Sequence, residues 1–485
     1  MSITSSLFAG ISGLNALGNA MTVIGDNIAN VNTIGFKGSR VTFQDVLSQT
    51  VGTASGTTQV GRGTAMADIS SSFAQGSFES TESATDLAIG GAGFFMVRDP
   101  DNENSEYFTR SGEFRFDQDG NFVNPGGYIV QGYALNETTG ENEGRVADIA
   151  LPGFKSAPSE TDKLTSIMNL DSSSDNNSNI PADNTALSVA WDGSNVDGEY
   201  IADDAYEYQT SLKVYDSLGK THDISIYFDK GVSATANPVW EYIVTCHPGE
   251  DARSGATGAN LGLLARGTIE FNGTTGQLSG ADSTITIRLN TGSGWAAADL
   301  TNADAIASGG YFAVTPQFDG TPTAMSIKLD FGARYNGTTA WANDTSSTTQ
   351  YSASSTTNSQ TATGYGAGDL NSITVGTDGV ITGQYSNGQV IPLYRVELFK
   401  FNNEQGLYKV GGNLFSETRL SGEKIPGNPG ENGLGSISPN SLEQSNTDLA
   451  TEFVRMITTQ RGFQANSKVI TTVDQMLADL INLKR

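Results

Sequence analysis

The sequence has little cysteine and little histidine. Its 485 residues include one cysteine, Cys246, and two histidines, His222 and His247. A single cysteine excludes a disulfide framework within the chain. These three residues are too few for a typical zinc site unless carboxylates complete it, and the neighbours Cys246 and His247 would face opposite sides of a strand. We therefore predict no metal ion and no cofactor, and we expect His222 at a strand end on the surface.

Other chemical motifs are incomplete. Residues 117–121 begin like a calcium-binding loop, but the glutamate expected near the twelfth position is absent and the glycine comes too early. Residues 90–93 lack the third glycine of a dinucleotide-binding loop, and no helical pattern follows them. Carboxylates are abundant, but nothing singles out a pair suited to glycoside hydrolysis. The sequence therefore favours a protein that is not an enzyme.

Basic residues and long apolar runs are also scarce. Lys and Arg number 27 against 53 Asp and Glu, so the formal net charge is −26. Charges cancel within 1–50 and within 441–485, so the acidic excess lies between them. No basic patch exists to neutralise phosphates, so we expect no nucleic-acid partner. No run of eighteen apolar residues is present and the first basic residue is Lys37, so we expect no membrane insertion and no standard cleavable signal.

What the sequence does contain is a row of apolar residues seven apart at each end. This spacing is the a/d pattern of coiled-coil helices. We therefore predict a helical inner-core domain built from 1–34 and 441–485, whose apolar rows form the core interface of a polymer. The N-terminal rows are Leu7, Leu14, Met21 and Ile28, then Leu17, Ile24 and Val31. The C-terminal row is Leu442, Leu449, Met456, Phe463, Ile470 and Leu477, joined by Val473 and Leu480.

The N-terminal stretch that carries these rows also contains four glycines, Gly10, Gly13, Gly18 and Gly25. Each glycine costs a helix about 1 kcal/mol relative to alanine, while small residues let neighbouring helices approach closely. One interpretation is that both ends are loose in the monomer and become ordered on assembly. The other is an ordinary two-helix hairpin that completes one globular core. Periodicity by itself does not separate the two.

The rest of the chain is rich in glycine and in alternating apolar residues, which is typical of β-domains. We predict hairpin turns at 119–120, 378–379 and 387–388, long surface loops at 171–188 and 342–366, and a helix start near Ser441 or Ser445. The predicted fold class is multidomain α+β, with a terminal helical coiled-coil core domain and nested, mainly-β outer domains. Its parts are an extended connector at 35–75, an inner β-domain from 76–150 and 369–440, and an outer β-domain at 151–368 that forms either one domain or two subdomains.

A specific motif follows the first helix. Residues 13–37 resemble the N-terminal signature of the flagellar axial proteins, the family of rod, hook and hook-associated subunits. The signature positions are Asn27, Asn30, Thr33, Gly35, Phe36 and Lys37. Residues 107–133 resemble the first β-domain of this family, and residues 212–228 and 442–477 are similar to segments of its hook branch.

The resemblance implies a structural role outside the cell. Hook subunits form a curved tube that carries torque from the motor to the filament, with the terminal helices innermost. The implied partners are copies of the chain itself, the rod, hook-cap and hook-associated proteins, and the flagellar type III export apparatus. Two alternatives stay open: a distal-rod or hook-associated subunit, and a secreted adhesin or surface-layer protein.

Overall fold

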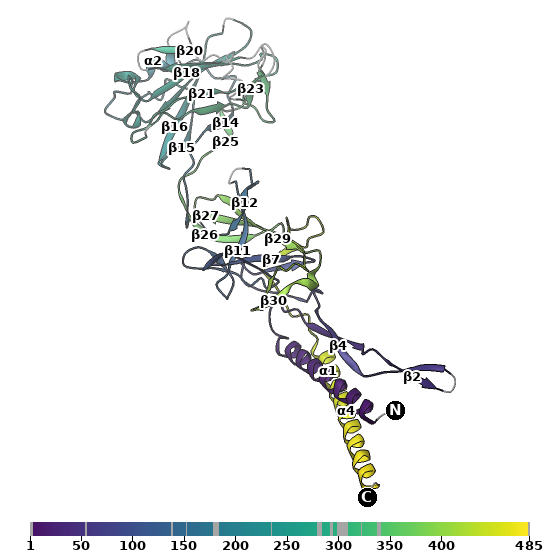
Figure 1. Cartoon of the computed structure of the whole chain (residues 1–485). Coiled ribbons are helices and arrows are strands. Elements are labelled where there is room, and N and C mark those ends of the chain that lie inside the picture. The colour runs from purple at the N-terminus through teal and green to yellow at the C-terminus, as the bar shows by residue number, and fades with distance from the viewer. Residues whose placement is uncertain are drawn as a thin grey trace. The chain divides into compact units, whose positions relative to one another are not determined.

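The computed structural model describes residues 3–53, 56–136, 139–151, 153–177, 184–233, 235–278, 284–291, 294–297, 309–321, 323–336 and 341–483. The chain divides into two compact units. Unit 1 is assembled from both ends, Met1–Phe154 and Leu370–Arg485, and unit 2, Lys155–Asp369, is inserted between them. Figure 1 shows long helices at the two ends of the chain, and nearly all of the other elements are β-strands. The predicted combination of terminal helices with mainly-β domains is confirmed.

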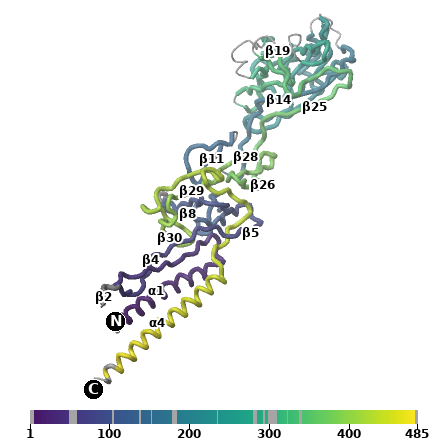
Figure 2. The backbone as a smooth tube through the Cα atoms, turned by 90° about the vertical axis from the view of Figure 1, so that its right-hand side faces the viewer, coloured from purple at the N-terminus to yellow at the C-terminus, as the bar shows by residue number. Residues whose placement is uncertain are grey.

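Two long helices lie at the ends of the chain. They are α1 (Ile3–Ala29) and α4 (Leu449–Leu483), and they lie side by side in Figures 1 and 2. They run antiparallel, because a Cβ placed on Gly10 would lie 3.1 Å from Ile470, whereas Leu17 lies opposite Gly462. The two ends therefore form a helical hairpin within one chain.

The buried line of α1 differs from the predicted heptad rows. Its buried residues are Gly10, Gly13, Ala16, Ala20, Ile24 and Asn27, while Leu7, Leu14, Met21 and Ile28 are only half-buried. A Cβ on Gly13 would come within 2.8 Å of the side chain of Asn466, so the helices are in contact through small residues. Small residues let two helix backbones approach, and larger side chains are then displaced to the flanks of the contact.

The second helix begins later than predicted. Ser441–Glu443 form strand β34, which pairs with β5 (Phe78–Ser80), so Leu442 lies on a strand and not in the helical row. The helix is capped by Asp448, whose Oδ1 accepts a hydrogen bond of 2.7 Å from the Thr451 backbone amide. The predicted helix start at Ser441 is therefore wrong, because pairing with β5 uses the backbone at 441–443, and the alternative start at Ser445 lies three residues before the observed cap at Asp448.

Residues 39–71 differ from the single extended connector that we expected. They form the antiparallel pair β1 (Ser39–Asp45) and β4 (Thr64–Ser71), continued by β2 (Gln49–Thr53) and β3 (Gly56–Val60). Apolar cross-strand pairs hold the first hairpin, among them Val41 with Ile69. It also contacts α1, because the Thr64 amide donates a 3.2 Å hydrogen bond to Ser12 Oγ.

The rest of unit 1 is a β-domain whose core draws on both ends of the chain. Val97 and Val130 from the N-terminal part pack in one cluster with Ile381 and Val396 from the C-terminal part. Its remaining strands, beside β5 and β34, are β6 (Leu87–Gly90), β7 (Phe94–Asp99), β8 (Asn102–Thr109), β9 (Arg115–Phe116), β10 (Phe122–Val123), β11 (Ile129–Leu135), β12 (Asn142–Asp148), β26 (Gly368–Val375), β27 (Val380–Tyr385), β28 (Val390–Val396), β29 (Leu398–Lys400), β30 (Tyr408–Gly411), β31 (Leu414–Ser416), β32 (Ile425–Gly427) and β33 (Ser436–Pro439).

The three predicted hairpin turns are confirmed. Gly120, Gly379 and Gly388 have φ values of 85°, 77° and 80°, a left-handed conformation that glycine adopts without strain. They join β9 to β10, β26 to β27, and β27 to β28. These local turn signals were sufficient because each turn is fixed by its own residues.

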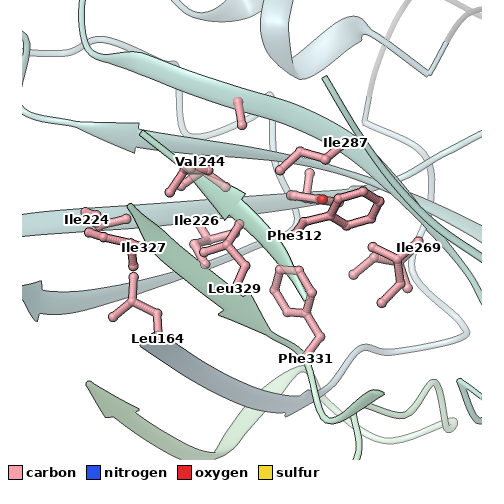
Figure 3. Packing of buried hydrophobic residues seen from close by; sticks show 14 of the residues in the cluster. Leu164, Ile224, Ile226, Val244, Ile269, Ile287, Phe312, Ile327, Leu329 and Phe331 are labelled. Atoms are coloured by element: carbon pink, nitrogen blue, oxygen red, sulfur yellow. The ribbon is translucent and has the colours of Figure 1, made fainter. Parts of the chain in front are cut away.

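In the part of unit 2 that the structure describes, two sheets share one core, and a third sheet, β23-β24, has two strands. A six-stranded antiparallel sheet runs in the order β15-β16-β17-β18-β19-β20, and a four-stranded sheet in the order β21-β22-β14-β25. Figure 3 shows Ile224, Ile226 and Val244 of the first sheet packed near Leu329 of the second. The elements are β13 (Lys155–Ser156), β14 (Lys163–Asn169), α2 (Ala186–Ala190), β15 (Tyr208–Tyr215), β16 (Thr221–Lys230), β17 (Val239–Cys246), β18 (Leu263–Glu270), β19 (Thr284–Asn290), β20 (Trp295–Ala297), β21 (Phe312–Val314), β22 (Ile327–Asp330), β23 (Ala333–Tyr335), β24 (Trp341–Asn343) and β25 (Thr356–Ala362).

Two expectations for unit 2 are wrong. The stretch 342–366, predicted as a loop, contains β25, whose Thr/Ser-rich sequence pairs with β14. His222 is buried rather than on the surface: its Nδ1 lies 2.8 Å from a Glu250 carboxylate oxygen and its Nε2 3.2 Å from Asp216. The ring also stacks on Phe318 at a centroid distance of 3.8 Å. Of the predicted loop at 171–188, residues 178–183 lie outside the described residues.

Candidate functional site

The signature residues after α1 form a joint between the helices, the first hairpin and the β-domain. Asn27 makes two hydrogen bonds of 2.8 Å to the backbone of Ser39, one as donor and one as acceptor, and so holds the start of β1 against the end of α1. Asn30 accepts a 3.1 Å hydrogen bond from Thr33 Oγ1, which shapes the turn that follows the helix. These polar residues therefore set the direction in which the chain leaves α1.

Gly35 and Phe36 bring the same turn against the β-domain. Gly35 has φ 70°, and a Cβ there would lie 2.5 Å from the backbone nitrogen of Ser111. Its amide donates a 2.7 Å hydrogen bond to the Glu443 carbonyl. Phe36 is buried, and the Lys409 ammonium lies 5.4 Å from its ring centroid. Only glycine fits at position 35, because both its conformation and the space exclude a side chain.

A buried ion pair lies at the centre of this joint. Lys37 Nζ is 2.7 Å from Glu443 Oε1, and both side chains have 0% exposure. Glu443 Oε1 also accepts a 2.8 Å hydrogen bond from the Gly76 amide, and Lys37 donates one of 2.9 Å to the Ala74 carbonyl. The second oxygen of Glu443 lies 3.7 Å from Arg110. One carboxylate thus connects four segments of unit 1.

Burial disfavours the charged forms of the two cations in this cluster. Burial lowers the pKa of Lys37 from its ordinary 10.5, while the hydrogen bond and the charge of Glu443 act in the opposite direction. Burial likewise lowers the pKa of Arg110, again opposed by Glu443. Glu443 therefore opposes the effect of burial on both cations inside the joint.

The helical hairpin leaves apolar side chains in solvent. Leu449, Phe453 and Phe463 on α4 are 42%, 49% and 44% exposed. With half-buried Met456 they recur at spacings of four, three and seven residues, which places them on one face of the helix. We call these four residues the α4 apolar row. Phe8 and Ile11 on α1 are also exposed, at 66% and 40%. A folded chain usually leaves such a row in solvent where another molecule covers it.

The predicted interface residues fall into distinct groups. Ile24, Leu442 and Val473 are buried within the single chain and are therefore core residues rather than open surface. Leu449 and Phe463 are exposed, and the side chain of Leu480 lies outside the described residues. The half-buried group consists of Leu7, Leu14, Leu17, Met21, Ile28, Val31, Met456, Ile470 and Leu477. Their part in a polymer interface stays a prediction.

The apolar character of α1 has a second consequence. Ser5–Ala29 has a mean hydropathy of 1.4 and is long enough to cross a bilayer, although it contains no unbroken apolar run. The core helix of a soluble protein passes the same test of length and composition. Here α1 packs on α4 through Gly10 and Gly13, which accounts for a small, apolar face.

Relatives with known names resemble this chain over its full length. The flagellar hook protein FlgE of Borreliella burgdorferi is 34% identical over 494 aligned residues, which cover 99% of each chain. The chain belongs to the flagellar hook protein family. The Escherichia coli K12 hook protein FlgE is 31% identical over 98% of each chain. A crystal structure of Helicobacter pylori flagellar hook protein FlgE2 matches 76% of this chain and all of that chain, with 16% identity and a TM-score of 0.47.

Family models match this hook-family chain in four consecutive parts. Residues 7–37 match the flagella basal body rod protein, and 88–195 match the flagellar hook protein FlgE/F/G D1 domain. Residues 190–365 match the flagellar basal body protein FlaE D2 domain, and 438–483 match the flagellar basal body rod FlgEFG protein C-terminal model. This is a structural flagellar family rather than an enzymatic one.

Two features of this hook-family protein escaped sequence reasoning. The contact between α1 and α4 follows glycine and alanine, whereas the predicted rows consist of large apolar residues at heptad spacing. The sequence indicated that Gly10 and Gly13 let helices approach closely, but it did not predict that they lie at the centre of the shared face. The cluster of Lys37, Glu443 and Arg110 had no local signal in the sequence. Lys37 and Glu443 are 406 residues apart and meet only in the folded unit.

Proposed function

We propose that this chain is the structural subunit of the bacterial flagellar hook, and that it assembles with copies of itself into a curved tube that transmits motor torque to the filament. Membership of the flagellar hook protein family supports this proposal. The observation that carries the assembly step is the α4 apolar row, which one chain leaves uncovered.

The energetics favour covering this row. Fully burying a Leu, Met or Phe side chain contributes roughly 1.5–3 kcal/mol, so the α4 apolar row supplies several kcal/mol for each subunit that joins. Charges in 441–485 cancel, so many copies of α4 can be brought together without net repulsion. In our proposal the helical hairpins of many subunits form the inner core of the tube as a coiled-coil-like layer, and the predicted interface residues line it.

The outer parts have a different role in this proposal. The acidic excess lies outside the two ends, so contacts between outer domains of neighbouring subunits are expected to be polar and individually weak. Weak outer contacts allow neighbours to slide while the tightly packed inner helices resist twisting. The division into an inner helical part, a region at 35–75, an inner β-domain and an outer β-domain at 151–368 belongs to the same proposal.

The proposed location is the hook of the extracellular flagellum, attached to the basal body. The proposed partners are further copies of the chain, the rod, hook-cap and hook-associated proteins, and the type III export apparatus. Membership of a flagellar family supports them, and the rod models matched at both ends are consistent with contacts near the basal body. No nucleic acid is among the proposed partners.

The test changes one residue of the α4 apolar row. Phe453→Ser removes a half-exposed ring that the single chain does not need for its core. The matched control is Val196→Ser in unit 2, where the side chain is 95% exposed. Both variants should keep wild-type helix content by circular dichroism. We expect wild-type protein and the control to sediment as polymers that electron microscopy shows as curved tubes, and Phe453→Ser to stay in the supernatant.

Two results would contradict the proposal. Curved tubes formed by Phe453→Ser at the wild-type protein concentration would remove the α4 apolar row from the assembly interface. Flat sheets formed by the wild-type protein would favour the surface-layer alternative, and straight tubes would favour a rod subunit.

A further inference from the structure

Two arginines lie directly opposite one another on neighbouring strands of unit 2. Arg266 on β18 pairs in register with Arg288 on β19, and Thr268 pairs with Thr286 two positions along. Side chains two residues apart on a strand share a face, so all four project from the same side of the six-stranded sheet. With Asn184, Thr185 and Gly267 they line a cleft of about 420 Å³.

Arg266 is held in a fixed orientation. Its Nη1 donates a 2.9 Å hydrogen bond to Ser188 Oγ in α2, and its guanidinium carbon lies 4.2 Å from the centroid of the Trp295 ring. Stacking on an indole ring and a hydrogen bond to a neighbouring element restrict the rotamers of an arginine. The positive charge on one wall of the cleft is therefore already positioned.

Arg288 is exposed and has no such support. Among the residues that the structure describes, no carboxylate lies within 4.0 Å of its guanidinium and no acceptor is hydrogen-bonded to it. Like charges directly opposite on two strands repel one another and destabilise the pair. This arrangement is unexpected in a chain that has 53 acidic residues and 27 basic ones, because a carboxylate partner would be easy to supply.

A buried acid on the same face of the sheet, Glu241, is hydrogen-bonded to α2 and not to the arginines' cleft. Glu241 on β17 accepts a 3.1 Å hydrogen bond from the Leu187 amide of α2. Burial raises its pKa to about 7, so this carboxyl is only partly charged near neutral pH. Asp229 lies beside Glu241 in register on β16 and is buried as well. Neither acid is among the residues that line the cleft, so the cleft keeps a positive character.

We propose that this cleft binds a carboxylate or another oxyanion of similar size. Arg266 is the donor that the fold already holds in place, and Arg288 is the exposed donor that binds the anion from the neighbouring strand. Two guanidinium groups on one face can each donate to the oxygens of a single anion, and charge-assisted hydrogen bonds of this kind are stronger than neutral ones. The hydroxyls of Thr268 and Thr286 are hydrogen-bonded to each other at 2.7 Å, so one hydroxyl hydrogen of the pair is left to donate at the other end of the cleft. The anion is supplied either by an acidic side chain of a second copy of this chain or by a free organic acid.

The test measures protection of Arg288 from a guanidinium reagent. Purified full-length protein is treated with phenylglyoxal in sodium chloride, in citrate and in inorganic phosphate at equal ionic strength, and mass spectrometry gives the rate at each arginine. We expect citrate and phosphate to slow modification of Arg288 by about threefold or more, since the anion occupies its donors. The internal control is Arg334 in the same unit, whose side chain is 60% exposed, and its rate should not change.

A second variant tests the two-arginine arrangement. Arg266→Gln removes the fixed charge, so citrate should no longer protect Arg288, while limited proteolysis of unit 2 should match wild type. The proposal is overturned if Arg288 reacts equally fast in all three salts, or if protection persists in Arg266→Gln.

Sedimentation velocity then separates the two sources of the anion. Self-association that is broken by citrate and absent in Arg288→Gln assigns the carboxylate to a second copy. Protection by citrate without any self-association that depends on Arg288 assigns the cleft to a free acid. Both measurements use unpolymerised protein and address unit 2, so they stand or fall separately from the role of the α4 apolar row.

Discussion

Glu443→Gln tests the ion pair at the centre of the joint. The substitution keeps the shape of the side chain and an acceptor for the Gly76 amide, but it removes the negative charge that is paired with Lys37 and lies 3.7 Å from Arg110. Both partners of the 2.7 Å pair have 0% exposure, so water cannot replace the lost charge. Breaking a buried ion pair on one side typically costs about 3–5 kcal/mol, and we expect a loss in this range.

The dependence on pH gives the expected sign. Burial lowers the pKa of Lys37 below 10.5, and Glu443 opposes that shift, so the substitution should lower this pKa further. Between this lowered pKa and 10.5 the unfolded chain then binds more protons than the folded one, and stability rises with pH in that window. The cost of Glu443→Gln should therefore shrink as the pH is raised from neutral toward 10.

Hydrogen exchange measured by mass spectrometry is the assay, because it reports the opening of the joint separately from unit 2. Peptides that contain Gly35 and Gly76 should exchange faster in Glu443→Gln than in wild type, and the free energy of opening follows from the rates. The matched control is Asp223→Asn, which breaks a surface pair with Lys213 that is more than half exposed on both sides. A cost below about 1 kcal/mol that does not change with pH would refute the reasoning, since that is the range of surface pairs.

Two further predictions follow from unit 1 and unit 2. Gly13→Ala should weaken the helical hairpin, because its Cβ would lie 2.8 Å from Asn466; overpacking costs about 1–3 kcal/mol, and the better helix propensity of alanine offsets about 1 kcal/mol of this. The control, Gly18→Ala, meets nothing within 4 Å and should stabilise the hairpin. Equal melting shifts of the helical signal in the two variants would contradict this prediction. Burial acts to raise the pKa values of Asp216 and Glu250, but contacts with His222, joined by backbone amides at Asp216 and by the charge of Lys220 at Glu250, together lower both, so unit 2 should lose stability as the pH falls below the ordinary values of 3.8 and 4.5. Asp216→Asn should flatten this acid limb in a denaturation series, and an unchanged limb would exclude the His222 cluster as its origin.

Local signals in the sequence were sufficient to predict the hairpin turns, the two terminal helices and the family. The turn at Gly120 needs only a residue that adopts positive φ, and the same holds for the turns at Gly379 and Gly388. The signature positions from Asn27 to Lys37 could be found because they lie within one short stretch, although their purpose could not be read from the stretch alone.

The tertiary structure decided everything that depends on residues distant in the chain. Heptad spacing predicted both helices but not the face that they share, because backbone proximity, set by Gly10 and Gly13, outweighs the size of the apolar residues. Pairing with β5 placed Leu442 on a strand, although its spacing fitted the helix. The partner of Lys37 lies 406 residues away, and an ion pair buried at 0% exposure exists only after both ends of the chain have folded into one unit.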